Sequence, residues 1–437
     1  MKIPMLIISD APSASSGLGR ICRDLATRIH TNLGDLFEVA TLGYGGIGDS
    51  SLPFMQYHIE GMDNWYIPTL MDVWNNFAGK RRGVVFTIWD ASRMLWFSRP
   101  DEEAFVPDPD MRKWLRNAPF ERWGYFPMDA AGPSDALSMM LYQTMVGYDR
   151  IIAYSDWAEK IIRNTMSEAD CEKRNLVAIP HGIDTSVFRP RNIGRSIFRS
   201  ELHYNGRTFE DYEKLIGIVA TNQTRKDYGL AIEALAIASN NCAFRFFINV
   251  DALERHWSIP ALVVDFNLKH RAIVNMNPVE DWALAEVYSA CDLTLGIGPE
   301  GFGYPIFESL ACGTPVIAGQ VGGHAEHMPA EFLMKPIATR IETVYNCVRP
   351  VYDPKQWAYH IEKALKRNKT KESLLPARLD WNNLWANEWE PYFKAQHRRI
   401  AHPVPTLIQP SNMNETDTAS MVPDTPKVSS PGGYLAP

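Results

Sequence analysis

The feature that most constrains the fold is the stretch 298–319, which reads Gly-Pro-Glu-Gly-Phe-Gly-Tyr-Pro-Ile-Phe-Glu-Ser-Leu-Ala-Cys-Gly-Thr-Pro-Val-Ile-Ala-Gly. It follows an apolar run at 293–297 and leads through a glycine-rich loop into a helix. We expect that helix to begin at Pro305, because proline lacks the N–H that stays unpaired in a first turn. Since a helix N-terminus attracts anions, the pattern predicts a phosphate site at the carboxyl end of a parallel strand. The N–H groups facing the phosphate would be those of Phe302, Gly303 and Tyr304.

Strands, loops and helices alternate along most of the chain, which predicts an α/β fold of two Rossmann-like, doubly wound domains facing a cleft. A chain of 437 residues is long for one core, since single cores stop growing at about 250–300 residues. Apolar runs typical of buried parallel strands occur in both halves. They are 2–9, 37–42, 83–88, 151–154 and 177–180 in the first half, and 215–220, 244–250, 293–297 and 316–318 in the second.

The domain boundary is predicted from a polar segment that follows Pro190. We expect a first, acceptor-side domain at 1–195 and a second, donor-side domain at 196–385. Helical patterns near the C-terminus predict a helix at 386–401 that packs back on the first domain. The remainder, 402–437, is rich in Pro, Ser, Thr and Asn and is expected to be a disordered, flexible tail.

The bulk charge does not favour a nucleic-acid or membrane partner. The net charge is −7, which attracts neither a phosphate backbone nor an anionic membrane. The six cysteines are scattered without a Cys-x-x-Cys pair, which is typical of reduced core residues. No apolar run approaches the ~20 residues needed to cross a bilayer. We therefore expect a cytoplasmic protein with no integral membrane segment.

Two glutamates, Glu300 and Glu308, flank the glycine loop with seven residues between them. With the internal Gly-Phe-Gly and the following Ala-Cys-Gly-Thr-Pro-Val-Ile-Ala, this spacing resembles the signature of the retaining GT-B glycosyltransferases of family 4, relatives of sucrose and glycogen synthases. The resemblance implies transfer of a hexose-type sugar from a nucleotide diphosphate sugar to an acceptor hydroxyl. It also implies that Glu308 accepts hydrogen bonds from the ribose and that Glu300 contacts the transferred sugar. A helix-capping acidic pair on a solvated loop is the alternative.

A basic pair, Arg225 and Lys226, follows the first strand of the second domain. Two adjacent cations neutralise the charge that builds on a diphosphate as the glycosidic bond breaks, which is the work of a metal ion in other enzymes. The family has a similar pair with the arginine several residues before the lysine, whereas Thr221 occupies that earlier position here. We assign both residues a catalytic role beside Glu300. A solvated charge pair is the alternative.

The segment Ser-Ser-Gly-Leu-Gly-Arg at 15–20 resembles the first glycine loop of the family. The resemblance implies that Gly17, Gly19 and Arg20 approach the donor from across the cleft. An ordinary helix start with a serine cap is the alternative. The Arg20 side chain is expected to meet either a phosphate or the acceptor.

His181 lies in Ile-Pro-His-Gly-Ile-Asp at 179–184, which resembles the interdomain signature of the family. We assign it to donor binding, with a purely architectural role as the alternative. The His-rich acceptor motif of many members is missing, and the corresponding strand ends in Trp-Asp-Ala-Ser. We expect Asp90 to replace it as a catalytic contact to sugar or acceptor, or else to be a buried structural residue. Residues 125–129 form a second candidate acceptor edge.

No metal and no cofactor is predicted. Asp108 and Asp110 spell Asp-x-Asp, the metal motif of the other large glycosyltransferase fold. They lie in a loop rich in Pro, Asp and Glu with no apolar strand before it, so we expect a solvated turn. No other group of His, Cys, Asp or Glu has the spacing of metal ligands.

Other functions stay open at this stage. Phosphorylases and sugar-nucleotide epimerases share the fold, but no lysine motif for pyridoxal phosphate is present and 300–319 resembles transferases better. A non-catalytic protein that binds sugar nucleotides is a further alternative, because the acceptor motif is altered. The predicted partner is the nucleotide-sugar donor, with a glycan, a lipid, a small molecule or a modified DNA base as acceptor. The apolar run at 94–97 is either core or an exposed lipid-facing patch.

Overall fold

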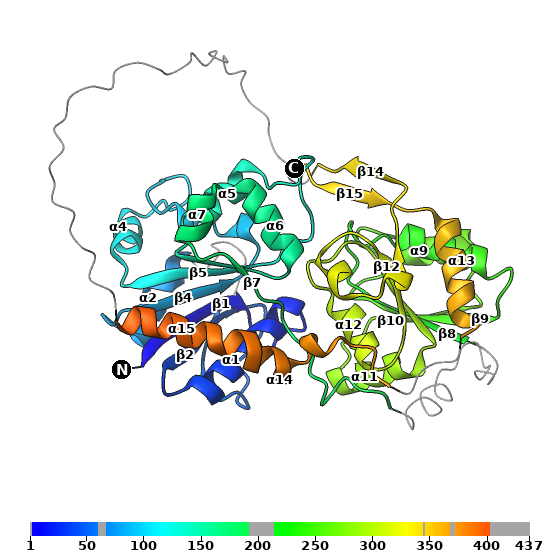
Figure 1. Ribbon diagram of the computed structural model, residues 1–437, viewed down its shortest axis with the longest axis horizontal. Helices are drawn as coiled ribbons and strands as arrows, with labels where there is room; N and C mark the ends of the chain where they lie inside the picture. Colours follow the sequence, from blue (N-terminus) through cyan, green and yellow to red (C-terminus); the bar gives the residue numbers. More distant parts are fainter. Residues whose placement is uncertain (1, 60–66, 192–213, 344–345, 368–371, 403–437) are drawn as a thin grey trace, which may run out of the picture. The chain divides into compact units, whose positions relative to one another are not determined.

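The computed structural model describes residues 2–59, 67–191, 214–343, 346–367 and 372–402. The predicted boundary at 195/196 and the predicted tail beyond His402 lie outside these ranges. The described chain forms two parallel sheets with helices on both faces, so the predicted α/β class with two Rossmann-like domains is confirmed (Figure 1).

The first sheet has the order β3-β2-β1-β4-β5-β6-β7, with every pair parallel. Its strands are β1 (Ile3–Asp10), β2 (Phe37–Tyr44), β3 (Met55–Ile59), β4 (Gly83–Ile88), β5 (Phe120–Phe126), β6 (Arg150–Ala153) and β7 (Val177–Ala178). Its helices are α1 (Gly17–Leu33), α2 (Ile67–Phe77), α3 (Leu95–Ser98), α4 (Pro109–Asn117), α5 (Met139–Val146), α6 (Asp156–Thr165) and α7 (Glu168–Lys173).

The second sheet has the order β10-β9-β8-β11-β12-β13 and is also parallel. Its strands are β8 (Lys214–Val219), β9 (Phe244–Asn249), β10 (Ala272–Asn275), β11 (Leu293–Gly296), β12 (Val316–Gly319) and β13 (Leu333–Met334). An antiparallel hairpin follows, made of β14 (Ala338–Ile341) and β15 (Val348–Val351). The helices are α9 (Tyr228–Ala238), α10 (Ile259–Asp265), α11 (Asp281–Ala290), α12 (Tyr304–Ala311) and α13 (Pro354–Leu365).

Both faces of the first sheet are buried, which explains its long apolar strands. Along β1, Ile3, Met5 and Ile7 pack into the cluster that contains α1 and the C-terminal helix α15 (Glu390–Ala401). Leu6 and Ile8 face the other way, into the cluster formed by α2 to α6. A strand covered on both sides is apolar at every position, because successive side chains point to opposite faces.

The C-terminal helices belong to the core of the first domain. After α14 (Trp381–Leu384), one π-helical turn (Trp385–Trp389) leads into α15. The ring of Phe393 stacks on Trp123 of β5 at 6.3 Å between centroids, and the indole N–H of Trp389 donates to the carbonyl of Pro180 at 2.9 Å. The chain therefore leaves the first sheet after β7 and returns to it at its C-terminal end.

The two crossings of the chain between the sheets run side by side. The N–H of Ile183 donates to the carbonyl of Leu379 at 2.8 Å, and the N–H of Trp381 donates to the carbonyl of Ile183 at 3.1 Å. Gly182 lies against the Trp381 ring so closely that a Cβ on Gly182 would collide with it.

Asp108 is exposed, in agreement with the predicted solvated turn, and is also the N-cap of α4. Its Oδ1 accepts hydrogen bonds from the N–H groups of Asp110 and Met111. Its carboxylate is thus used by a helix terminus, which explains an Asp-Pro-Asp sequence without a metal.

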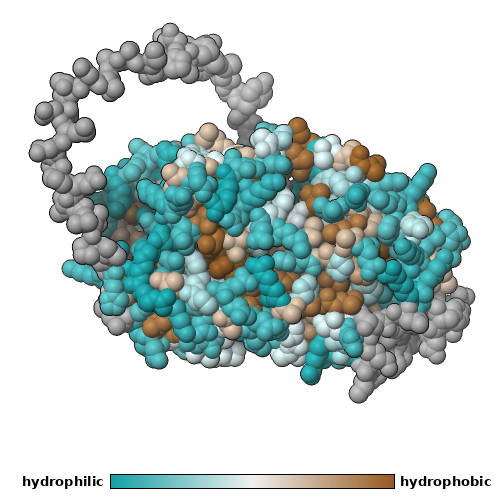
Figure 2. Space-filling view, in the orientation of Figure 1, coloured by the Kyte–Doolittle hydropathy of each residue, from teal (hydrophilic) through white to brown (hydrophobic). Residues whose placement is uncertain are grey.

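Apolar side chains are mostly inside. Residues Met94, Leu95, Trp96 and Phe97 are all buried, so the core alternative for this run is confirmed. On the face shown in Figure 2, hydrophilic side chains cover most of the described surface and the apolar ones form separate small patches. Among the described residues, no helix is both long and apolar enough to cross a membrane.

Candidate functional site

The loop between β11 and α12 is shaped by glycines at left-handed φ. Gly298 has φ +77° and passes so close to the backbone of Arg225 that a Cβ would collide with its carbonyl. Gly303, with φ +90°, is the N-cap of α12, which begins at Tyr304, one residue earlier than predicted. Only glycine adopts such a backbone without strain. The sequence therefore brings a helix N-terminus directly beside the loop that carries the basic pair.

Glu300 is the centre of a charged cluster. Its Oε1 forms an ion pair with Lys226 Nζ, and its Oε2 lies 3.1 Å from Nη1 of Arg225. Nη1 of Arg225 also donates to the carbonyl of Pro299 at 2.9 Å. Lys226 is only 5% exposed, and burial, with a smaller contribution from Arg225, lowers its pKa well below the ordinary lysine value. The three residues predicted to act on the diphosphate and sugar thus lie together.

The same cluster reaches the first domain through Asp129. Arg225 Nε lies 2.9 Å from Oδ2 of Asp129, which follows β5. Arg349 of β15 lies 3.7 Å from the other oxygen of Asp129. The second candidate acceptor edge therefore contacts the basic pair directly.

Glu308 is buried in α12, with 1% exposure. Its Oε2 accepts a hydrogen bond from the hydroxyl of Tyr288 at 2.9 Å, and its Oε1 forms an ion pair with Arg20 of the first domain. Arg20 also pairs with Asp281, and Arg23 lies 3.1 Å from the second oxygen of Asp281. Glu308 is thus contacted by Tyr288 at one oxygen and by a guanidinium from α1 at the other.

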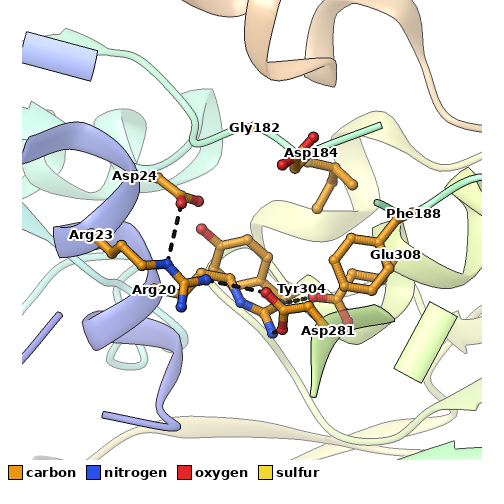
Figure 3. A pocket seen from close by; sticks show the side chains of 10 residues that line it. Arg20, Arg23, Asp24, Gly182, Asp184, Phe188, Asp281, Tyr304 and Glu308 are labelled. Carbon is orange, nitrogen blue, oxygen red and sulfur yellow. Dashed lines mark hydrogen bonds and ion pairs between the residues drawn. The ribbon is translucent and has the colours of Figure 1, made fainter. Parts of the chain in front are cut away.

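These residues line a small pocket, shown in Figure 3, to which α1, α11, α12 and the segment after β7 contribute. Asp24 is a partly buried carboxylate of this pocket, and desolvation raises the pKa of Asp24 to about 6 despite the nearby Arg23 and Arg20. The indole N–H of Trp381 donates to Asp24 at 3.1 Å. The lining residues are Arg20, Arg23, Asp24, Gly182, Ile183, Asp184, Phe188, Asp281, Tyr304 and Glu308.

His181 lies in an aromatic cluster and not in the lining of this pocket. Its ring centroid is 4.0 Å from that of Phe302 and 5.0 Å from that of Tyr304, and its Nδ1 lies 2.9 Å from the hydroxyl of Tyr125. Burial lowers the pKa of His181 well below its ordinary value, so the ring is neutral. This placement gives His181 an architectural contact with the glycine loop.

The first glycine loop shows features of both alternatives. The N–H of Gly19 donates to Ser16 Oγ at 3.0 Å, the serine cap of an ordinary helix start. Gly17 faces the second domain, where a Cβ added to it would lie 3.8 Å from the Tyr304 ring. Arg20 makes the ion pairs described above.

The hydrogen bonds described for Asp90 are not with the charged cluster around Glu300. Asp90 is exposed after β4, and its Oδ1 accepts from the N–H and the hydroxyl of Ser92. Asp281 and Tyr288 were not predicted as site residues. Both lie on α11, and only their contacts with residues distant in sequence mark them.

The glycine loops also let the two domains approach each other closely. A Cβ on Gly301 would collide with the carbonyl of Met128, and a Cβ on Gly323 with Ser155. Beside this seam, the Glu326 carboxylate accepts hydrogen bonds from the first N–H groups of α6, those of Asp156 at 3.1 Å and of Trp157. The two domains therefore contact each other at the glycine loop.

His324 makes the stability of this seam sensitive to pH. It is fully buried, with Nε2 2.8 Å from the carbonyl of Gly319, and burial lowers its pKa from 6.5 to about 4. Between pH 6.5 and about pH 4, His324 is mostly protonated in the unfolded chain and mostly neutral in the folded chain. The free energy of unfolding should therefore fall as the pH drops through this window, by up to about 2 kcal/mol at pH 5.

Urea unfolding at pH 7.5 and pH 5.0 tests this expectation in the wild type and in His324→Gln. The variant should lose part of the stability difference between the two pH values. An equal difference in both proteins would show that another group causes it.

Among the residues described here, no group of three or more His, Cys, Asp or Glu side chains is arranged to hold a metal ion. The charges that face the glycine loop are those of Arg225 and Lys226, held by Glu300.

Comparison with known proteins identifies the second domain. Residues 213–367 match the family model described as "Glycosyl transferases group 1". The second domain is therefore similar to the glycosyltransferase group 1 family. The matched residues include Glu300, Glu308, Arg225 and Lys226.

Curated relatives of the chain are D-inositol 3-phosphate glycosyltransferases. The protein of Segniliparus rotundus is 28% identical over 192 residues, which are 41% of this chain and 40% of that protein. The protein of Mycobacterium marinum is 25% identical over 260 residues, 56% of this chain and 50% of that protein. The chain thus spans half or less of the length of these relatives.

Solved structures share the fold over nearly the whole chain. A glycosyltransferase from Rickettsia africae ESF-5 has a TM-score of 0.61 at 15% identity, covering 92% of this chain and 100% of that one. Anabaena Alr3699/HepE in complex with UDP and glucose has a TM-score of 0.63 at 14% identity, with coverages of 90% and 100%. Sucrose-phosphate synthase from Thermosynechococcus elongatus has a TM-score of 0.60 at 16% identity, with coverages of 90% and 99%. The predicted GT-B fold is confirmed.

Proposed function

We propose that this protein is a retaining glycosyltransferase that moves a hexose-type sugar from a nucleoside diphosphate donor to an acceptor hydroxyl. The observation that carries the proposal is the cluster of Glu300, Arg225 and Lys226 beside the N-terminus of α12. Two cations and a helix N-terminus converge there on one small volume. Such a constellation is suited to an anion whose charge grows during reaction.

The donor is proposed to lie along the second domain. Its ribose would bind Glu308, its diphosphate would lie between Arg225 and the N-terminus of α12, and its sugar would reach Glu300. The relatives named glycosyltransferases and the fold neighbour in complex with UDP and glucose support a nucleotide-sugar donor. Because the Arg20 guanidinium pairs with Glu308, a ribose that binds Glu308 would have to displace this guanidinium.

In the proposed reaction, the bond between the anomeric carbon and the diphosphate oxygen breaks while a bond to the acceptor oxygen forms on the same face of the sugar. The acceptor proton goes to the departing phosphate oxygen. Arg225 and Lys226 stabilise the charge on the diphosphate, so that no metal is required in this scheme. Closure of the first domain excludes water and brings the acceptor to the sugar.

Calorimetric titration in the presence of EDTA tests the proposal, with UDP-, GDP-, ADP- and CDP-sugars as ligands. We expect one nucleotide to bind, and Glu308→Gln to weaken it about 10- to 100-fold, as for the loss of a charged hydrogen-bond acceptor. Glu331→Gln is the matched control, because Glu331 is exposed and pairs only with Arg367 among its described ion pairs. Failure of every sugar nucleotide to bind would refute the proposal and favour a different ligand.

A further inference from the structure

Tyr288 is the only described residue of the second domain whose side chain is seen to hydrogen bond to Glu308. Its hydroxyl lies 2.9 Å from Glu308 Oε2, and its side chain is 1% exposed. Burial raises the pKa of Tyr288 well above its ordinary value, so the phenol stays protonated and donates. One oxygen of Glu308 is therefore engaged from within its own domain.

The partner of the other Glu308 oxygen, Oε1, comes from the first domain. Arg20, which pairs with Oε1, belongs to α1 of the first domain, whereas Tyr288 and Glu308 lie on the neighbouring helices α11 and α12. A movement of the first domain away from the second would separate Arg20 from Glu308, whereas the tyrosine contact lies within the second domain. The carboxylate then keeps its orientation while Oε1 becomes available.

Tyr288 is itself held in place. Its carbonyl accepts a hydrogen bond from Thr314 Oγ1 at 2.6 Å, and its ring lies 6.3 Å from that of Phe188. A carboxylate fixed at one oxygen loses less rotamer freedom when a ligand binds the other, and preorganisation of this kind raises affinity.

We propose that Tyr288 is a positioning residue for recognition of the nucleotide ribose, because it fixes Glu308 so that Oε1 meets a ribose hydroxyl. This inference rests on the proposed function, since it takes Glu308 as the ribose contact. The ligand it selects is a nucleoside diphosphate with an intact ribose, as opposed to its 2′,3′-dideoxy analogue.

The test compares UDP, GDP, ADP and CDP with their 2′,3′-dideoxy analogues in wild type and Tyr288→Phe. For the nucleotide that binds, the variant should lose about 5- to 10-fold in affinity for the ribonucleotide and nothing for the dideoxy analogue. In a Glu308→Gln background, Tyr288→Phe should have no further effect. If Tyr288 had only a structural role, Tyr288→Phe would weaken the binding of both ligands equally.

Tyr148→Phe is the matched control, since Tyr148 is a buried tyrosine of the first domain whose hydroxyl lies 2.9 Å from Thr87 Oγ1. It should leave both affinities unchanged. Equal affinities of Tyr288→Phe and wild type for the ribonucleotide, or equal losses for both ligands, would overturn the inference while leaving the proposed function intact. Absence of binding by all four nucleotides to the wild type would overturn both.

Discussion

Lys226→Ala is expected to slow the release of nucleoside diphosphate from a bound sugar donor about 100- to 1,000-fold, the typical effect of removing one electrostatic stabiliser of a transition state. The lysine is 5% exposed and pairs with Glu300. Little water can therefore reach the site to compensate for the charge that the alanine variant lacks. Its interaction strengthens as the diphosphate gains charge, which lowers the barrier and not only the energy of the bound donor. A single-turnover assay at saturating donor measures this rate apart from binding.

Arg367→Ala serves as the control for Lys226→Ala, because Arg367 carries the same charge in the same domain but forms an exposed ion pair with Glu331. It should release nucleotide at the wild-type rate. Lys226→Arg keeps the charge and should retain more activity than the alanine variant. If Lys226→Ala turned over at the wild-type rate, the lysine would only be a structural partner of Glu300.

Trp389→Ala should lower the free energy of unfolding of the first domain by about 3–5 kcal/mol, as large-to-small changes of buried aromatic residues do. The Trp389 side chain is fully buried, its ring stacks on Phe393 at 5.5 Å, and its N–H donates to Pro180. Truncation leaves both a cavity and an unpaired carbonyl. Urea unfolding followed by near-UV circular dichroism measures the loss.

Trp282→Ala is the matched control, since Trp282 is 58% exposed on α11. It should change the free energy of unfolding by no more than about 0.5 kcal/mol. Similar small losses in the two variants would mean that the helix carrying Trp389 contributes little to the first domain.

The strands that the sequence predicted are those with uninterrupted apolar runs. The strand β5 was missed as a strand because Glu121 and Arg122 interrupt its pattern. The structure compensates for this buried glutamate with Arg399 of α15, a residue far away in the sequence. No local pattern encodes such a pair. The hairpin β14–β15 was missed for another reason, because neither of its strands has a buried face.

The site divides in the same way. Glu300 and Glu308 could be predicted from one short motif, and Arg225 and Lys226 from a second one, because each pair lies close together in the sequence. The contacts of Glu308 with Arg20 and Tyr288, and the ion pair of Arg20 with Asp281, were not predicted, because two separate helices, α1 and α11, supply these residues. Asp90 was assigned from its place after a strand, and the structure uses it to cap the following turn. Sequence spacing thus locates a motif, and the folded chain determines which groups surround it.

The return of the C-terminal helix to the first sheet has a consequence for synthesis of the chain. Domains commonly fold on the ribosome in order from the N-terminus. Here the hydrophobic core on one face of the first sheet is incomplete without Trp389 and Phe393, which are translated after the entire second sheet. The second domain can complete its core while one face of the first is still uncovered. The nascent first domain is therefore the part that needs protection from aggregation until the last helix emerges.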